Sequence, residues 1–206
     1  MPLSESSLVP FINIIRFAAL SIVVAFASGC AHKITISPDL TKIEAPANTP
    51  RINANVAYYI AEADLAKTVT TPGGGGDKVK YQPYKELETA FYKMLSNVFA
   101  NVIKIKTPEP TPADNVDFVI VPTLVTDSSS SSFVTWPPTR FTTNLITKVT
   151  GTANNGGATI TVMEAGEAEF SEFKRDFGLA ARRSTQAALL KTQEALIAAP
   201  ELTAKR

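Results

Sequence analysis

The apolar residues of the chain fall into segments with two different periods. Residues 52–60, INANVAYYI, alternate apolar and more polar side chains, and this period of two predicts a strand. Residues 84–102 repeat apolar side chains at three- and four-residue spacing behind Pro83, which predicts an amphipathic helix. A nearly continuous apolar run over 116–126 predicts a buried strand, with a bulge or an unpaired stretch at Pro122.

A hairpin and a second helix complete the predicted elements. Residues 140–150 read as a strand, and a turn at Asn-Asn-Gly-Gly, residues 154–157, returns the chain as a strand from Ala158 toward Phe170. Residues 173–199 predict a long alanine-rich helix whose small side chains would allow close packing on a sheet. The order of elements predicts an α+β two-layer domain, with two main helices on one face of a mixed, mostly antiparallel sheet of four or five strands. The side chains expected in its core are Leu87, Phe91, Leu95, Phe118, Ile120, Phe141, Leu145, Val149, Ile160 and Val162.

The N-terminal apolar run has a different character. Residues 17–27 are apolar or small without interruption after Arg16, but a bilayer requires about 20 apolar residues. A positive flank, a short apolar core and a small-residue exit are the layout of a secretory signal, so residues 1–29 are predicted to be a signal peptide. Plain secretion without a lipid, and an uncleaved membrane anchor counted from Leu8, are the alternatives.

The only cysteine of the chain, Cys30, follows this run directly. The tetrapeptide Ala-Ser-Gly-Cys, residues 27–30, resembles the lipobox of bacterial lipoproteins, although leucine is more common at the position of Ala27. The resemblance implies that Cys30 is lipidated and becomes the first mature residue, at the periplasmic face of a bacterial envelope. Ala31, in place of an aspartate, favours the outer membrane by the same resemblance. Stable anchoring takes at least two acyl chains, which lipoprotein maturation supplies.

The rest of the chain suits one domain. Residues 30–50 contain three prolines and no helical period, so we predict a lipidated N-terminus and flexible tether there, with Ile34 and Ile36 able to add a short edge strand. Residues 51–206 are then a single α+β periplasmic domain. The 20 basic and 19 acidic residues balance, which argues against a nucleic-acid partner.

Candidate chemistry is sparse. The only histidine, His32, lies beside the predicted anchor, so no Ser-His or Cys-His dyad is expected in the domain. The glycine run 73–76 lacks the Gly-Lys-Ser/Thr ending of a phosphate-binding loop and is predicted to be a plain loop. We therefore expect no enzymatic activity, no metal site and no cofactor.

One segment suggests an interaction surface. Residues 127–139, DSSSSSFVTWPPT, read as a polar serine loop that carries Phe133 and the only tryptophan, Trp136. Tryptophan is enriched at binding hot spots, so these two aromatic residues are candidate partner contacts. Trp136 could equally cap one end of the core, and the sequence leaves both readings open.

Four segments, SGCAHKITISPDL, DFVIVPTLV, TANNGG and AARRSTQAALLKTQEAL, together resemble the YajG-type periplasmic lipoproteins. That group has the α+β architecture also found in the N-terminal domain of TolB and in curli-secretion lipoproteins. The chain departs from it in two longer loops, TPGGGGDK and DSSSSSFVTWPPT. The resemblance implies a non-enzymatic protein that binds other envelope components, and it transfers no catalytic residue.

The function expected from the sequence is therefore that of an accessory of an envelope complex, acting by binding or assembly. Three alternatives belong to other classes. They are the auxiliary lipoprotein of a lipid-transporting ABC system, an activator of a cell-wall synthase and, on the serine tract alone, a serine-type hydrolase.

Overall fold

The main feature of the fold is a five-stranded mixed sheet with the strand order β5-β2-β6-β7-β8. The structure is a computed structural model that describes residues 31–131, 136–152, 156–173 and 175–203. The strands of this sheet are β2 (Ile52–Tyr58), β5 (Phe99–Lys104), β6 (Phe118–Ser129), β7 (Arg140–Gly151) and β8 (Ala158–Glu167). Strands β5, β2 and β6 are parallel, whereas the longer β6–β7 and β7–β8 ladders are antiparallel.

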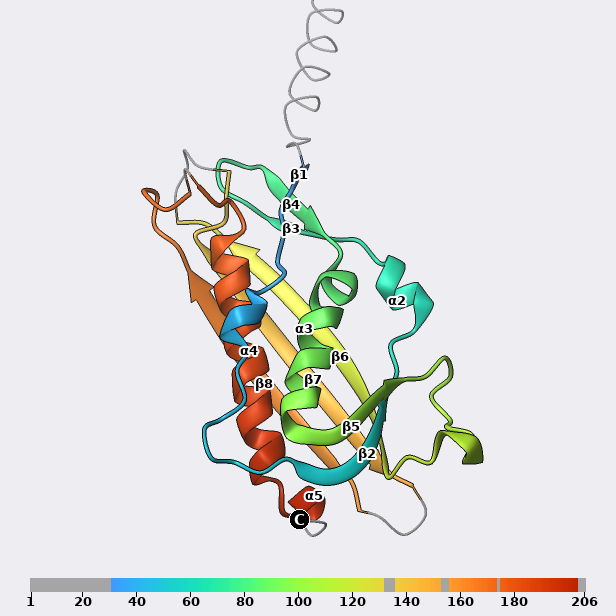
Figure 1. Ribbon diagram of the computed structural model, residues 1–206. Helices are drawn as coiled ribbons and strands as arrows, with labels where there is room; N and C mark the ends of the chain where they lie inside the picture. The colour runs from blue at the N-terminus through green and yellow to red at the C-terminus, as the bar shows by residue number, and fades with distance from the viewer. Residues whose placement is uncertain (1–30, 132–135, 153–155, 174, 204–206) are drawn as a thin grey trace, which may run out of the picture.

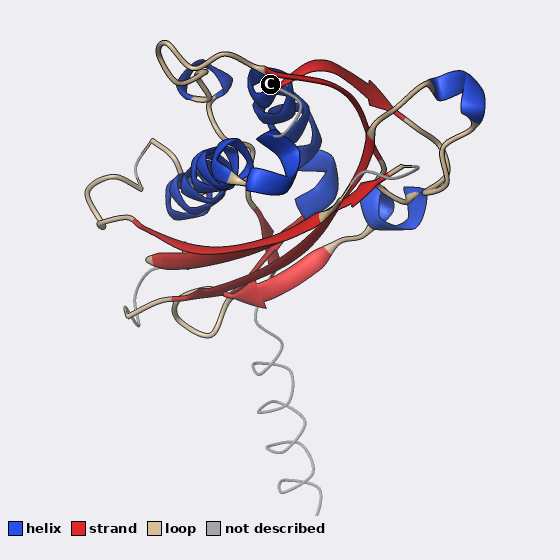
Figure 2. Cartoon of the chain, turned by 90° about the horizontal axis from the view of Figure 1, so that it is seen from below, coloured by secondary structure: helices blue, strands red, loops and turns tan. Residues whose placement is uncertain are grey.

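Two long helices, α3 (Pro83–Val98) and α4 (Leu179–Ala198), cover one face of this sheet. Figure 2 shows both of them on the side toward which the sheet curves. The two-layer α+β architecture predicted from the sequence is thus confirmed. Short helices complete the described fold: η2 (Leu40–Lys42), α2 (Glu62–Ala66), η3 (Pro112–Asp114) and α5 (Pro200–Thr203).

The space between the sheet and the helices holds the main core. It is built from the inward faces of β2, β6 and β7 and from the apolar stripes of α3 and α4. The predicted core residues of α3, β6 and β7 are buried, but Ile160 and Val162 are only half-buried. The reason is that β8 is the edge strand, so its side chains have a neighbouring strand on one side only.

A second, three-stranded sheet closes one end of the molecule (Figure 1). Its strands are β1 (Ala31–Lys33), β3 (Val69–Pro72) and β4 (Lys78–Tyr81), in the order β1-β4-β3. Beneath it lies a smaller core, which we call the end core: Ile34, Ile36, Val79, Tyr81, Phe141, Ala168, Phe173, Ala180 and Ala181.

The N-terminal segment is part of this end core, and the flexible tether predicted for it is wrong. Ile34 and Ile36 are buried in the end core and Ile43 in the main core, and the Ile36 carbonyl accepts a hydrogen bond from Thr185 Oγ1 on α4 at 2.8 Å. The prolines favour an extended chain, but they do not prevent the isoleucines between them from packing into the core. The free energy gained by burying these large apolar side chains exceeds the conformational entropy lost when the segment is ordered.

Both predicted helices are longer than the helices observed. The first ends at Val98, and residues 99–104 form β5, because parallel pairing with β2 satisfies the backbone there. The second begins at Leu179, since residues 168–173 and 175–178 form a loop with turns that brings Ala168 and Phe173 into the end core.

Strand β6 bears on two further predictions. No bulge occurs at Pro122, which pairs with Thr147 of β7 in an unbroken register. The pairing of β6 with β2 ends at Ile120, so on that edge Pro122 lies beyond the ladder, as the second alternative predicted. Backbone groups of alternate residues in a strand point to the same side. The Ile120 carbonyl accepts a hydrogen bond from Tyr59 N, on the side away from β7, and the backbone nitrogen of Pro122 faces that same side. The missing N–H of Pro122 therefore removes no hydrogen bond from the β6–β7 ladder. The strand also continues into the serine tract, where the buried Ser128 hydroxyl donates to the Pro72 carbonyl at 2.6 Å.

Candidate functional site

The most distinctive surface of the domain surrounds the point where the described chain begins. Here β1 starts at Ala31, directly after Cys30, and runs parallel to β4. Figure 1 shows the β3–β4 turn and the loop between β8 and α4 at the same end of the molecule. We call this surface the β1 end and define it by residues 31–33, 73–80, 136–139, 168–173 and 175–178. Cys30 and Phe133 lie outside the described residues, so the structure does not test either prediction.

Trp136 lies within the β1 end and is half-buried. Its ring stacks on His32, with ring centroids 4.2 Å apart, and contacts Phe177 at a centroid distance of 4.6 Å. Its carbonyl accepts a hydrogen bond from Gly74 N at 3.0 Å, and a Cβ on Gly73 would lie 2.3 Å from that same oxygen. Trp136 therefore packs over the end core, which is the second of the two readings of this residue. A role in partner contact stays a prediction.

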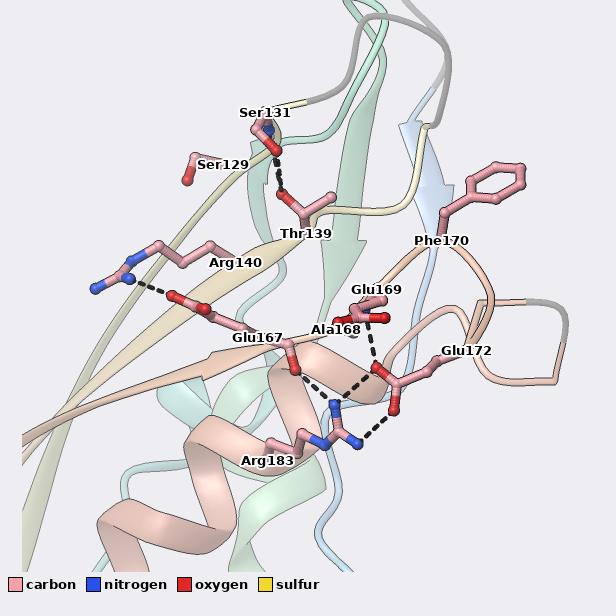
Figure 3. Close-up of a pocket in the computed structure, with 10 residues that line it drawn as sticks. All are labelled: Ser129, Ser131, Thr139, Arg140, Glu167, Ala168, Glu169, Phe170, Glu172 and Arg183. Atoms are coloured by element: carbon pink, nitrogen blue, oxygen red, sulfur yellow. Dashed lines mark hydrogen bonds and ion pairs between the residues drawn. The ribbon is translucent and has the colours of Figure 1, made fainter.

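An open hollow of about 970 Å³ lies beside this aromatic cluster. It is formed by the ends of β6, β7 and β8, the loop that follows β8, and the first turns of α4 (Figure 3). Its lining residues are Ser129, Ser131, Thr139, Arg140, Glu167, Ala168, Glu169, Phe170, Glu172 and Arg183.

Each arginine of the hollow is held by a carboxylate. Arg183 on α4 makes two hydrogen bonds to Glu172, at 2.6 and 3.0 Å, and a third to the Glu167 carbonyl at 2.7 Å. Arg140 pairs with the Glu167 side chain at 2.5 Å. The hydrogen bonds from Arg183, together with one from Glu169 N, lower the pKa of Glu172 to about 2. Arg183 thus joins the loop between β8 and α4 to the end of β8, and Arg140 joins β7 to β8. An anionic ligand would have to compete with these carboxylates.

Ser131, one of the two serines that line the hollow, is hydrogen-bonded locally. Ser131 N donates to Thr139 Oγ1 at 3.1 Å, and the two hydroxyl oxygens are 3.5 Å apart. His32, the only imidazole, bonds Asp77 at 3.1 Å and stacks on Trp136, so its recorded partners include no serine. The side chains around the hollow are mainly polar or charged.

Two features of the described ranges bear on metals and membranes. No group of three or more His, Cys, Asp or Glu side chains within these ranges is placed to hold a metal ion. None of the helices described is both long and apolar enough to cross a membrane.

Sequence reasoning found Trp136 but missed its neighbours. Trp136 contacts His32 and Phe177, and Arg183 pairs with Glu172 in the adjacent hollow. These residues come from separate segments, and no motif spacing in the sequence links them. One feature of the sequence could have indicated this cluster: the only histidine, His32, lies two residues after Cys30 and so places an imidazole ring next to the predicted anchor.

Comparison with known proteins finds similarity to solved structures. No family model matches the chain, and no curated protein gives a significant match. Protein XCC0632 of Xanthomonas campestris, described as belonging to the family DUF330, shares 13% sequence identity over 82% of this chain and 91% of its own, with a TM-score of 0.47. A second structure, described as an uncharacterised protein, shares 7% identity over 82% of this chain and 97% of its own, with a TM-score of 0.41. The YajG-type resemblance is not confirmed by these matches.

Proposed function

We propose that the protein is a lipid-anchored lipoprotein of the bacterial envelope, which acts by binding a partner at the membrane surface. The anchor is Cys30, at the periplasmic face of the outer membrane, and the domain serves as an accessory of an envelope complex. A small-residue box ending in cysteine and an apolar segment of signal-peptide length support the anchor.

One observation carries this proposal: the residue that follows Cys30 is already part of a strand. Ala31 pairs with Lys78 as the first residue of β1, and the isoleucines just beyond it are buried. A lipid on Cys30 would therefore hold the domain directly against the membrane instead of letting it reach away on a tether. Such a placement suits a protein that presents a fixed surface to a membrane-bound partner.

The polar side chains of the hollow, together with His32 of the β1 end, support binding over catalysis. Arg140 and Arg183 are paired with carboxylates, and His32 is stacked and hydrogen-bonded. A nucleophile requires a base within hydrogen-bond reach, and the recorded partners of Ser131 and His32 do not form such a pair.

The anchor is tested with the full chain expressed in a Gram-negative host. We expect the purified protein to begin at Cys30 and to carry acyl groups detectable by mass spectrometry of its N-terminal peptide. A Cys30→Ser variant should stay unprocessed or be released in soluble form, whereas Ser28→Ala, which keeps a small residue in the box, should be processed normally. If Cys30→Ser fractionates with membranes at the mature size, the proposal is wrong.

The binding role is tested by crosslinking the lipidated protein in cells and purifying it in mild detergent. We expect one stoichiometric envelope protein, whose recovery depends on the hollow, so that Arg140→Ala lowers it and Lys148→Ala on the outer face of β7 does not. Phospholipid as the only co-purifying species would favour the lipid-transport alternative. Turnover of an ester, peptide or glycan by the purified protein would overturn the binding role.

A further inference from the structure

We infer that the β1 end of the domain lies on the lipid surface itself, with Phe170 and Phe177 in the headgroup region and a lysine cluster facing anionic phospholipid. This inference rests on the proposed anchor at Cys30, and it adds a second, non-covalent contact between the protein and the membrane.

The first support is the exposure of two phenylalanines at this end. Phe170 is 67% exposed and Phe177 is 48% exposed. Both lie in the loop between β8 and α4, and in Figure 3 the Phe170 ring points away from the hollow. Exposing large aromatic side chains to water is unfavourable, and phenylalanine is among the apolar side chains by which interfacial segments enter the boundary between headgroups and acyl chains.

The second support is the path from these rings to the anchor. Phe177 contacts Trp136, Trp136 stacks on His32, and His32 follows Ala31 in β1. This continuous set of contacts links an exposed aromatic side chain to the residue next to Cys30. A bilayer that holds a lipid on Cys30 would therefore come close to Phe177.

The third support is the charge on the small sheet. Lys33, Lys78 and Lys80 are exposed, and the register places Lys33 opposite Lys80 and Ala31 opposite Lys78. No ion pair to these lysines occurs within the described part of the chain, whereas the carboxylates of Glu172 and Asp176 are held by arginines. A lysine near an anionic lipid surface is attracted to it, so the cluster and the phenylalanines favour the same occupant.

Trp136 provides a direct test because it is the only tryptophan in the chain. The lipidated protein is reconstituted into phosphatidylethanolamine/phosphatidylglycerol vesicles, with and without brominated acyl chains, which quench tryptophan at close range. We expect strong quenching of Trp136 in the bromolipid vesicles. The double variant Phe170→Ser/Phe177→Ser should lose most of that quenching, although its lipid still holds it to the vesicle.

Matched controls separate the contact from general effects of substitution. Met163→Ser removes a side chain of nearly equal exposure, 68%, from β8, and it should leave the quenching unchanged. Replacing Lys33, Lys78 and Lys80 by glutamine should reduce the quenching at low salt, whereas the same change at Lys85, Lys106 and Lys148 should not.

The two proposals fail in different ways. Flotation with vesicles tests the anchor, and quenching of Trp136 tests the contact of the β1 end. If wild type floats with the vesicles but shows no bromolipid quenching, the domain does not lie on the lipid through this end, and the inference is wrong while the anchor stands. Equal quenching of wild type and the phenylalanine double variant would also overturn it. If the chain is not lipidated, wild type will not float through Cys30, and the proposed function fails.

Discussion

The two cores of this domain are built in different ways. The main core lies between regular elements, where β2, β6 and β7 face α3 and α4, and each element contributes side chains at its own period. The end core is assembled from single residues of many segments, including the N-terminal strand region, β4, the loop after β8 and the first turn of α4. The difference shows that one part of the fold follows from local patterns and the other depends on long-range assembly.

The two cores nevertheless share elements. Strand β7 contributes Phe141 to the end core and Leu145 to the main core, and α4 contributes Ala180 and Leu189 in the same way. Because each shared element must be in place for both cores, we expect them to unfold in one cooperative transition. The following predictions compare the contributions of the two cores to the stability of the folded domain, beginning with the substitution expected to destabilise it most.

The largest effect is expected in the main core. Phe91 is 1% exposed on α3, and Phe91→Ala should lower the free energy of unfolding by about 3–5 kcal/mol through lost burial and a cavity. Chemical denaturation monitored by circular dichroism measures this change. The neighbouring Tyr92→Ala, on the exposed side of the same helix, should cost about 1 kcal/mol or less. Equal effects of the two substitutions would contradict the orientation of α3.

The end core should depend on the N-terminal segment. Ile36 is fully buried, so Ile36→Ala should cost about 2–5 kcal/mol in the same assay. Leu40→Ala is the control, because Leu40 is exposed and should contribute about 1 kcal/mol or less. If the Ile36→Ala variant is as stable as wild type, Ile36 does not contribute to the core, and the N-terminal segment would behave as the flexible tether predicted from the sequence.

The contact between α4 and β8 is tested by one glycine. A Cβ on Gly166 would lie 2.1 Å from the Ala180 carbonyl and 2.5 Å from Ser184 N, both backbone atoms that cannot rotate away. Gly166→Ala should therefore force α4 from the sheet and cost about 1–3 kcal/mol. At Gly156 the nearest atom to such a Cβ is 3.7 Å away, so Gly156→Ala should be close to neutral in thermal unfolding.

The smallest effect concerns the ion pair over the end core. Arg183 lowers the pKa of Glu172 to about 2 from an ordinary value near 4.5. A lowered pKa means that the pair stabilises the folded state above the unfolded pKa and that this stability is lost as the pH falls from about 4.5 to about 2. The difference in Tm between wild type and Glu172→Gln should thus be greatest at neutral pH and disappear near pH 2.

The exposed position of this pair keeps the expected difference small. Glu109→Gln, in the surface loop before η3, serves as the control and should track wild type at every pH. A Tm difference between wild type and Glu172→Gln that persists undiminished at pH 2 would show that the side chain acts through packing and not through its charge.

The sequence by itself determined the regular part of this protein. Helix α3 and the β7–β8 hairpin followed from their periods, because a period fixes which side of an element is apolar and therefore which side must be buried. The signal-like segment and Cys30 also came from the sequence alone. Trp136 was identified as unusual, but its surroundings were not.

Tertiary structure decided the rest. Residues 99–102 fit the end of a helix locally, but parallel pairing of β5 with β2 makes them part of a strand. Ile34 and Ile36 become buried only because β4 and α4 offer them a surface. The contacts of His32 with Trp136, and of Arg183 with Glu172, join separate segments by packing and charge. Local sequence constrains the backbone over a few residues, whereas these contacts gain their free energy only after distant segments have been brought together.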